Sequence, residues 1–352
     1  MNPQNSTFEF EDPIQRKSLA IIFIGISITG LAGNSLVLIS VILCRKLHNL
    51  NNIFVVNLSI ADIITCSLLP VNVVILWNPI EDTPPVAEWI CTASTAVNFI
   101  CVGVSVNTLA SISVIRLLVV TRPLQTHKPR WLIRLWILFT WLFPSAMILL
   151  PALILPGGFV LGYNTKYGVC TQKSSHPYIS IYNGINLLTF FLPLVVIIMC
   201  YTAIFIRHRH HSKKMIQSSG ENISDSNISL SSIYSISQFV KHTSDTRIKH
   251  TMMFKIQRRQ IQITKNMLCV VCVFILCILP YVIVAQKIIQ GDIVVRLVPY
   301  CGAFIYLNSA VNPFIYARHP NFRRVFRLML TCNWNEIPQP SMTLKFLTNY
   351  RI

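Results

Sequence analysis

A single carboxylate lies inside the long apolar runs of this sequence, Asp62 in the stretch Asn57-Leu-Ser-Ile-Ala-Asp. A carboxylate among neutral oxygen donors suits a small hard cation such as Na⁺, and it equally suits a protonated acid in a hydrogen-bonded cluster. A polar group within a membrane segment is costly, so either arrangement indicates a function. The further polar candidates in the apolar runs are Asn34, Ser105, Asn308, Ser309 and Asn312.

These groups need helices long enough to cross a bilayer. Of the 352 residues, 53% are hydrophobic and 12% charged, and the mean hydropathy is +0.56, which is typical of a membrane protein. About 20 apolar residues span a hydrocarbon core of about 30 Å. We therefore predict an all-α membrane protein, a seven-transmembrane helix bundle, with spans at 19–43, 53–77, 91–121, 132–155, 179–206, 264–287 and 294–317. The third span is rich in small and weakly polar residues, which favours the centre of the bundle.

The positive charges predict the orientation. With the N-terminus outside, 23 of the 30 Lys and Arg residues fall in the inner loops and tail, which is the side that retains them. The net charge of +18 is then a topology signal with attraction to anionic membrane lipids, and it indicates no nucleic acid. Residues 1–18 form the extracellular tail and 19–317 the seven-helix domain. With no positively charged start, we expect no removable signal peptide.

Two inner segments lie outside the spans. The third inner loop, 207–262, is Ser- and Asn-rich in its middle and is predicted to be largely disordered, with basic flanks that extend the neighbouring helices and contact either lipid headgroups or a protein. The segment 318–352 begins with a short amphipathic eighth helix at 319–330, which we expect on the inner surface. Cys332 beyond it is a candidate palmitoylation site.

The outer face carries two cysteines and a glycosylation motif. Cys91 and Cys170 both face an oxidising compartment in this topology, and we predict that they form a disulfide. Asn5-Ser6-Thr7 is an acceptor for glycosylation. The sequence contains no nucleophile elbow, phosphate loop or metal-ligand cluster, so we expect no enzyme and no required cofactor.

An ordered set of motifs, at least one in each span, resembles the rhodopsin-like (class A) G-protein-coupled receptors. The set comprises Gly33-Asn34, Leu58 to Asp62, Cys91 with Arg116, Trp141 with Pro151, Pro193 with Tyr201, Pro280, and Asn312-Pro313-Phe-Ile-Tyr316. The first inner loop is also faintly similar to melatonin-type receptors. The resemblance implies a multi-pass protein of the plasma membrane, with an extracellular ligand, a heterotrimeric G protein, arrestin and receptor kinases as partners. Arrestin would respond to phosphorylation in the serine-rich third inner loop.

The resemblance also implies roles for individual residues. Asp62, Ser105, Asn308 and Asn312 fall where the family holds an allosteric Na⁺. The coupling and switch positions are Arg116, Tyr201, Pro280, Asn312, Pro313 and Tyr316. Two positions depart from the family: Ile115 replaces the acid beside the arginine, and Ile278 replaces a tryptophan.

Arg116 has two interpretations. It can be an interfacial arginine that reaches for headgroups, or it can point into the bundle, because it shares a helix face with Asn98 and Ser105. We favour the second, in which Arg116 is the G-protein-contacting switch residue. Because Ile115 cannot hold Arg116 in the resting state as an acid would, we predict raised basal activity.

The ligand is expected to be uncharged. Asn98 replaces the aspartate that amine receptors carry, and Tyr306 stands where opsins carry the retinal lysine, so both ligand classes are disfavoured. Helical facing suggests a pocket of Asn98, Phe99, Val102, Thr189, Tyr281, Gly302 and Tyr306, which suits a small neutral or lipid-like molecule or a short peptide. The alternative to a G-protein-activating receptor is a receptor-fold protein without usual coupling: a scavenger, a heteromer partner or an arrestin-biased receptor. A transporter or channel is disfavoured because the sequence has one intramembrane acid and no internal repeat.

Overall fold

The fold was analysed in a computed structural model. It describes residues 10, 12–78, 85–121, 130–154, 156, 159–164, 166–173, 176–224, 268–284 and 292–344.

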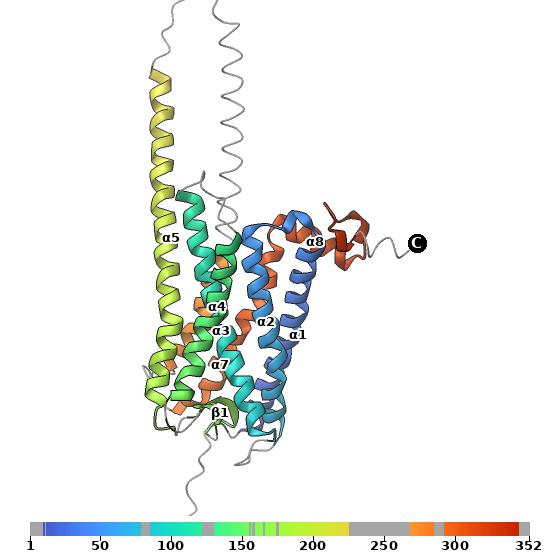
Figure 1. The fold of residues 1–352 in the computed structure, drawn as a ribbon, viewed down its shortest axis with the longest axis vertical. Helices are drawn as coiled ribbons and strands as arrows, with labels where there is room; N and C mark the ends of the chain where they lie inside the picture. Colours follow the sequence, from blue (N-terminus) through green and yellow to red (C-terminus); the bar gives the residue numbers. More distant parts are fainter. Residues whose placement is uncertain are drawn as a thin grey trace, which may run out of the picture.

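Within the described residues, seven helices form one bundle, which confirms the predicted fold class (Figure 1). Six of these helices are α1 (Pro13–Leu43), α2 (Leu50–Trp77), α3 (Glu88–Thr121), α4 (Arg130–Ile154), α5 (Ile179–Ser224) and α7 (Asp292–Ala317). The remaining one is Leu268–Val284, the sixth helix in chain order. Of the described helices, α1 to α5 are long and apolar enough to cross a membrane, and the sixth helix is shorter and apolar.

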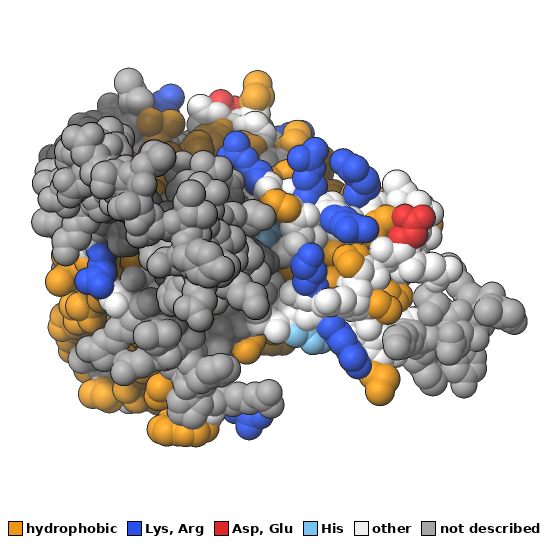
Figure 2. Space-filling model, turned by 90° about the horizontal axis from the view of Figure 1, so that it is seen from above, with side chains coloured by type: hydrophobic (Ala, Val, Ile, Leu, Met, Phe, Trp, Pro, Cys, Tyr) orange, Lys and Arg blue, Asp and Glu red, His pale blue; other side chains and the backbone are white. Residues whose placement is uncertain are grey.

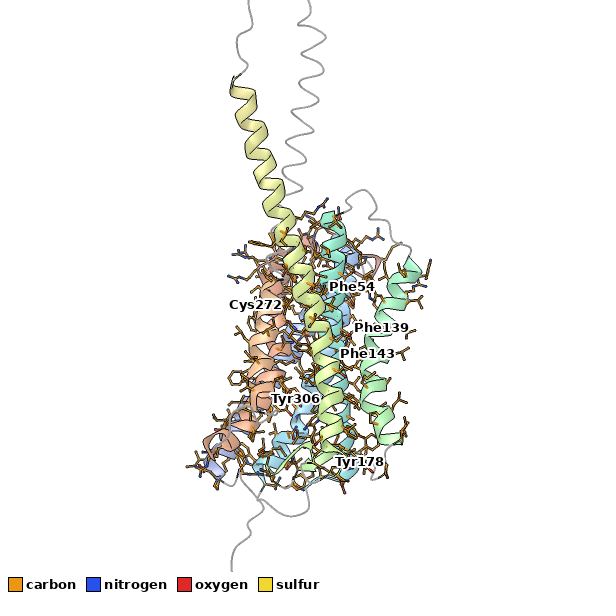
Figure 3. All side chains as sticks on the ribbon, turned by 90° about the vertical axis from the view of Figure 1, so that its left-hand side faces the viewer. Phe54, Phe139, Phe143, Tyr178, Cys272 and Tyr306 are labelled. Atoms are coloured by element: carbon orange, nitrogen blue, oxygen red, sulfur yellow. A yellow bond between two sulfur atoms is a disulfide. The ribbon has the colours of Figure 1, made fainter. Side chains whose placement is uncertain are left out.

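α3 is the central helix, as its composition predicts. It packs against α2, α4 and α5, and 72% of its most apolar window is buried, against 22% for α4. Phe139 and Phe143 on α4 stack on each other at 5.4 Å between ring centroids, and Phe139 is half exposed (Figure 3). Small residues therefore occupy the helix inside the bundle, while large apolar ones face outward.

Capping residues start the first two helices earlier than the hydropathy predicted. Asp12 Oδ1 accepts the Ile14 N–H at 2.8 Å, and Pro13 occupies the first turn, so α1 begins at Pro13 rather than at 19. Asn49 caps α2 in the same way. A side-chain oxygen that accepts a free N–H starts a helix whatever the hydropathy of the first turn.

α5 contains Pro193 and continues beyond the predicted span to Ser224, so the start of the third inner loop is helical. Figure 1 shows this extension projecting past the bundle at the end where α8 lies. The remainder of the loop, 225–262, lies outside the described residues.

A two-stranded hairpin covers the opposite end of the bundle, and the all-α prediction missed it. Strands β1 (Leu161–Asn164) and β2 (Val169–Gln172) pair antiparallel, with Tyr163 opposite Cys170. The predicted disulfide between Cys91 and Cys170 is confirmed and ties β2 to the start of α3, with 5.4 Å between the Cα atoms.

A buried arginine also holds the hairpin. Arg16 is only 3% exposed, and its guanidinium donates to the carbonyls of Ile75 at 2.9 Å and of Gly168 at 3.4 Å. It thereby joins α1, the end of α2 and the hairpin turn. Asn72 Oδ1 accepts the Cys170 N–H at 3.0 Å, and Lys173 pairs with Glu88 at 2.6 Å.

The amphipathic eighth helix is present as α8 (Pro320–Leu330). Five of its apolar side chains are buried, while Arg323, Arg324 and Arg327 are exposed. Figure 2 shows Lys and Arg side chains gathered on part of this end of the molecule. Cys332 follows it, exposed and with a positive φ of 57°. Its palmitoylation stays a prediction, and Asn5 lies outside the described residues.

Beyond α8 the chain folds back onto the first inner loop, which the sequence did not predict. The backbone of Arg45 donates to the Gln339 carbonyl at 3.0 Å, and Ser341 donates to that of Leu43 at 2.9 Å. Ile337 and Leu344 are each 2% exposed. Two buried apolar side chains therefore anchor this part of the tail.

Candidate functional site

A buried polar cluster joins α2, α3 and α7 at the middle of the bundle. Asp62 and Asn312 are both fully buried, and Asn312 Nδ2 donates to Asp62 Oδ2 at 2.9 Å. Ser105 and Asn308 are 4% and 3% exposed. A turn of α7 separates Asn308 from Asn312, which places both amides on one face of that helix.

The chemistry of this cluster fits a small cation. Asp62 Oδ1, Asn308 Oδ1 and Asn312 Oδ1 are buried oxygens with no hydrogen-bond partner among the described residues. Buried acceptors without donors are costly, and a hard cation satisfies them. The part of the chain that the structure describes holds no group of three or more His, Cys, Asp or Glu residues that could bind a metal, so the cation would depend on amide and hydroxyl oxygens beside one carboxylate.

A close contact between α1 and α7 supports the cluster from the side. A Cβ added to Gly33 would lie 2.7 Å from Pro313 Cγ, so only glycine allows this approach. The neighbouring Asn34 donates to the carbonyls of Gly30 at 2.9 Å and Ser309 at 2.8 Å. The pair Gly33-Asn34 thus fixes α1 against the turn of α7 that carries Asn308 and Asn312.

Arg116 lies in the inner part of the bundle, near the end of α3. It is 2% exposed and lies within electrostatic range of Tyr201. The preceding Ile115 is 6% exposed. It belongs to the hydrophobic cluster that also contains Tyr316 of α7 and Phe322 of α8, here called the inner hydrophobic core. The arginine therefore points into the bundle rather than to the headgroups. Pro280 lies in the sixth helix and Pro313 in α7. The switch roles of Arg116, Tyr201, Tyr316 and both prolines stay predictions.

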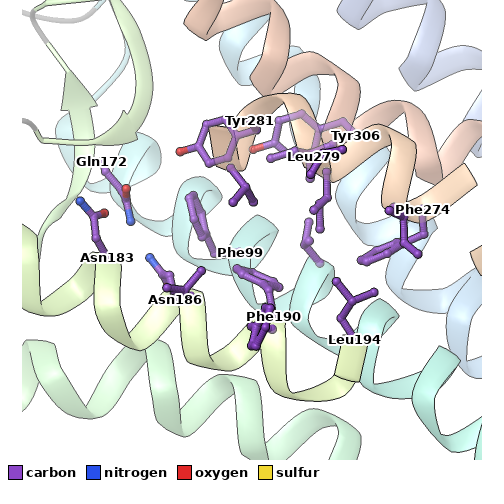
Figure 4. Close-up of a pocket in the computed structure, with 17 residues that line it drawn as sticks. Phe99, Gln172, Asn183, Asn186, Phe190, Leu194, Phe274, Leu279, Tyr281 and Tyr306 are labelled. Atoms are coloured by element: carbon purple, nitrogen blue, oxygen red, sulfur yellow. The ribbon is translucent and has the colours of Figure 1, made fainter. Parts of the chain in front are cut away.

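A cavity of about 230 Å³ lies between α3, α5, the sixth helix and α7, near the hairpin (Figure 4). None of the described residues that line it carries a charge. Its polar groups are three amides, from Gln172, Asn183 and Asn186, and the phenols of Tyr281 and Tyr306. Figure 4 shows the amides grouped at one end, with Phe99 and Phe190 beside them.

Four of the seven predicted pocket residues line this cavity: Phe99, Val102, Tyr281 and Tyr306. The other three do not. Asn98 is 1% exposed and buried among the helices, and Thr189 is fully buried, with its hydroxyl donating to the Ile185 carbonyl at 2.7 Å. Gly302 has no side chain to present, and nothing lies within 4 Å of a Cβ added there. Ligand binding by any of them stays a prediction.

Sequence reasoning missed every α5 residue that lines the cavity. Asn186 is 9% exposed, and its Oδ1 has no partner among the described residues. Asn183 and Asn186 are three residues apart, a spacing that puts both on one face of a helix, so this signal was available. Gln172 comes from β2, which no periodicity indicated.

The departure at Ile278 shapes the inner end of the cavity. Ile278 lines it together with Phe274, one turn before it on the sixth helix. An isoleucine occupies less space than the tryptophan that the family resemblance implies at this position. The cavity therefore reaches Phe274 and Leu194.

Comparison with known proteins identifies the family. The profile of the 7 transmembrane receptor (rhodopsin family) matches residues 33–316. The chain belongs to this family. It is a receptor-family protein that crosses the plasma membrane several times, as the sequence predicted.

Its relatives are distant. The chain is 27% identical to the octopamine receptor beta-2R of Drosophila melanogaster, over 90% of this chain and 62% of that protein. It is 25% identical to the G-protein coupled receptor moody of the same species, over 87% and 50%, and 27% identical to a Gq-coupled rhodopsin of Mizuhopecten yessoensis, over 85% and 56%. The chain thus spans between half and about six tenths of the length of these relatives.

The fold is similar to that of squid rhodopsin. The two structures agree with a TM-score of 0.70 at 20% sequence identity, over 94% of this chain and 93% of the other. At this identity the likeness establishes the arrangement of helices, and the ligand has to be argued from the residues that line the cavity.

Proposed function

We propose that this protein is a cell-surface receptor that binds a neutral, largely apolar ligand in the cavity beside the hairpin and activates a heterotrimeric G protein at its inner face. The observation that carries the proposal is the lining itself. Apolar side chains surround Asn186, a buried amide whose oxygen has no partner among the described residues. A ligand hydroxyl or amide N–H would donate to it, while the remainder of the ligand contacts the aromatic wall.

The relatives suggest other ligands, and the lining opposes them. Octopamine carries an amine, but Asn98 replaces the acid that would balance its charge, and the described part of the lining contains no carboxylate. In the rhodopsin comparison, Tyr306 replaces the lysine that would bind retinal. Both observations favour an uncharged ligand that is held without a covalent bond.

Signalling would follow from two arrangements of the bundle. A ligand that binds one arrangement better shifts the population toward it. Na⁺ at Asp62, Ser105, Asn308 and Asn312 would favour the other, resting arrangement, and Arg116 would meet the G protein when the inner ends of the helices separate. Receptor kinases would phosphorylate the third inner loop, and arrestin would bind the phosphorylated loop.

The test is expression of the full chain at the cell surface with sensors for each G-protein class, against a library of neutral lipids, sterols and short uncharged peptides. At least one sensor is expected to respond, and Asn186→Leu should weaken the response. Silence of every sensor, both basally and with the library, at confirmed surface expression would reject G-protein activation.

A second function has support of its own. Ile115 stands where the family carries an acid, and Ile278 where it carries tryptophan. A receptor-fold protein without usual coupling, such as a scavenger, a heteromer partner or an arrestin-biased receptor, would retain the cavity and lose G-protein activation. Arrestin recruitment or ligand uptake without any G-protein signal would favour it.

A further inference from the structure

The cavity is bordered on one side by residues of the outer surface of the bundle. Leu187 and Phe191 of α5 are 41% and 56% exposed, and Leu279 of the sixth helix is 48% exposed. All three also line the cavity. Phe99 and Val102, on the opposite side of the same cavity, belong to the central helix α3. The space therefore runs from the bundle interior to the surface between α5 and the sixth helix.

This opening lies at the depth of the hydrocarbon. α5 begins at Ile179, and a helix rises about 1.5 Å per residue, so Leu187 lies roughly 12 Å and Phe191 roughly 18 Å inward from that end. Both helices are apolar there, and their exposed side chains contact lipid tails when the protein is in a membrane. An opening at this depth faces the bilayer and not water.

The hairpin restricts access to the cavity from water. Gln172 of β2 lines the cavity, so the hairpin lies at that end of it. The Cys91–Cys170 disulfide ties the hairpin to α3, the Glu88–Lys173 ion pair adds a second link, and Arg16 joins its turn to α1 and α2. A cover that is fixed at several points by buried and covalent contacts opens at a high cost in free energy.

We propose that the cavity opens sideways into the leaflet on the hairpin side, between α5 and the sixth helix, and that its ligand is a neutral amphiphile that enters from the bilayer. The identity of the ligand rests on the proposed receptor function, whereas the opening does not. The apolar part of such a molecule passes Leu187 and Phe191, and its polar group reaches the amides of Asn183 and Asn186. A charged headgroup is disfavoured because the described lining offers it no partner.

The test measures how fast reagents from the bilayer and from water modify a thiol placed inside the cavity. Ile305→Cys places it on α7, at a position that lines the cavity. The full chain in lipid nanodiscs is treated either with dodecyl methanethiosulfonate, which dissolves in the bilayer, or with a trimethylammonium methanethiosulfonate in water, so that both reagents carry the same thiol-reactive group. Modification of residue 305 is followed by tandem mass spectrometry. The parent chain with Ile305 reports the background from the native cysteines.

Two neighbouring leucines provide a matched pair. Leu187 lines the cavity and Leu188 does not, yet both are exposed on α5, at 41% and 55%. In the Ile305→Cys background, Leu187→Trp should slow the dodecyl reaction by about fivefold, because an indole narrows the opening. Leu188→Trp should leave the rate unchanged, and Leu187→Ala should raise it. The alanine variant keeps the test decisive if the tryptophan variant folds poorly.

Three results would overturn the opening: equal rates in both tryptophan variants, reaction with the charged reagent as fast as with the dodecyl reagent, or no reaction with the dodecyl reagent. A competition then tests the ligand class. In the same assay 1-oleoylglycerol should slow modification by about threefold, and oleoyl phosphate should not, because only the uncharged headgroup suits the amides. Equal competition by both would reject the neutral class. Silent G-protein sensors with the expected labelling pattern would reject receptor signalling and leave the opening standing.

Discussion

Within one bundle, the cavity beside the hairpin and the cluster around Asp62 are built from different side chains. The cavity is walled by aromatic and aliphatic residues, with its amides at one end. The cluster places a carboxylate, two amides and a hydroxyl among α2, α3 and α7, almost completely buried. Apolar contacts are non-directional and tolerate changes of shape, whereas buried polar groups depend on each partner. Substitutions should therefore act gradually in the cavity and severely in the cluster.

The largest expected effect is at Asp62. Asp62→Ala removes the acceptor of the Asn312 amide, and leaving a buried donor without a partner costs about 1–3 kcal/mol. If Na⁺ binds the cluster, wild-type protein should unfold at a higher temperature in sodium chloride than in choline chloride, since a ligand that binds only the folded state stabilises it. Asp62→Ala should lower the unfolding temperature in both salts and remove the difference between them.

Asp62→Asn separates the two contributions, because it keeps the shape and an acceptor oxygen but removes the charge. It should retain most of the stability and lose the response to sodium. Ser67→Ala serves as the control, since Ser67 is an exposed residue of the same helix whose hydroxyl donates to the Ile64 carbonyl of its own helix. A sodium-dependent shift that persists in Asp62→Asn would exclude this carboxylate as a cation ligand.

The cavity should respond less, and most at its polar end. Asn186→Leu removes the buried amide while keeping a similar volume. Loss of one hydrogen bond to a neutral ligand is worth about 1.4 kcal/mol, so the agonist concentration for half-maximal response should rise by about tenfold. Dose–response curves with the agonist found in the sensor screen measure this.

Leu188→Ala is the matched control, since Leu188 is an exposed α5 residue that does not line the cavity. Its curve should overlie that of the wild type. If Asn186→Leu also leaves the curve unchanged, the amide end of the cavity does not hold the ligand. Only the substitutions in the cluster around Asp62 would then test the predicted difference between the two regions.

The sequence was sufficient for the bundle because the bilayer imposes the length and composition of each span. The missed features depend on contacts between distant segments. The sequence predicted Arg16 in the extracellular tail, yet it lies in α1, and the hairpin and α2 bury it against their carbonyls. Ile337 and Leu344 are buried in one hydrophobic cluster with Leu47 of η1 (Arg45–Leu47) and Phe322 of α8, a contact that the local sequence of the tail does not reveal.

The candidate site likewise has one part that the sequence predicted and one part that depends on packing between helices. Asp62 with Asn312 follows from the order of motifs, and the structure brings the two side chains into contact. Four of the seven predicted pocket residues line the cavity, from α3, the sixth helix and α7. Helical facing did not predict the rotation of α5 or the contribution of β2. Thr189 illustrates the error: its hydroxyl is satisfied within its own helix, and Asn186 presents its amide to the cavity instead. Rotation of a helix is set by packing, which one sequence does not reveal.

The smallest expected effect is at Ile115, where the inner end of the bundle combines both kinds of side chain. Ile115 is 6% exposed in the inner hydrophobic core, beside the buried Arg116. Ile115→Asp would place a carboxylate next to the guanidinium and so restore the acid that, by the family resemblance, holds Arg116 in the resting state. Because both positions are buried, the cost of desolvating the carboxylate offsets most of its attraction to the guanidinium, so basal G-protein signalling should fall by only about threefold at equal surface expression. Ile115→Asn has nearly the same shape without the charge and should leave basal output closer to that of the wild type. Equal output from the aspartate and asparagine variants would show that charge at position 115 does not control the resting state.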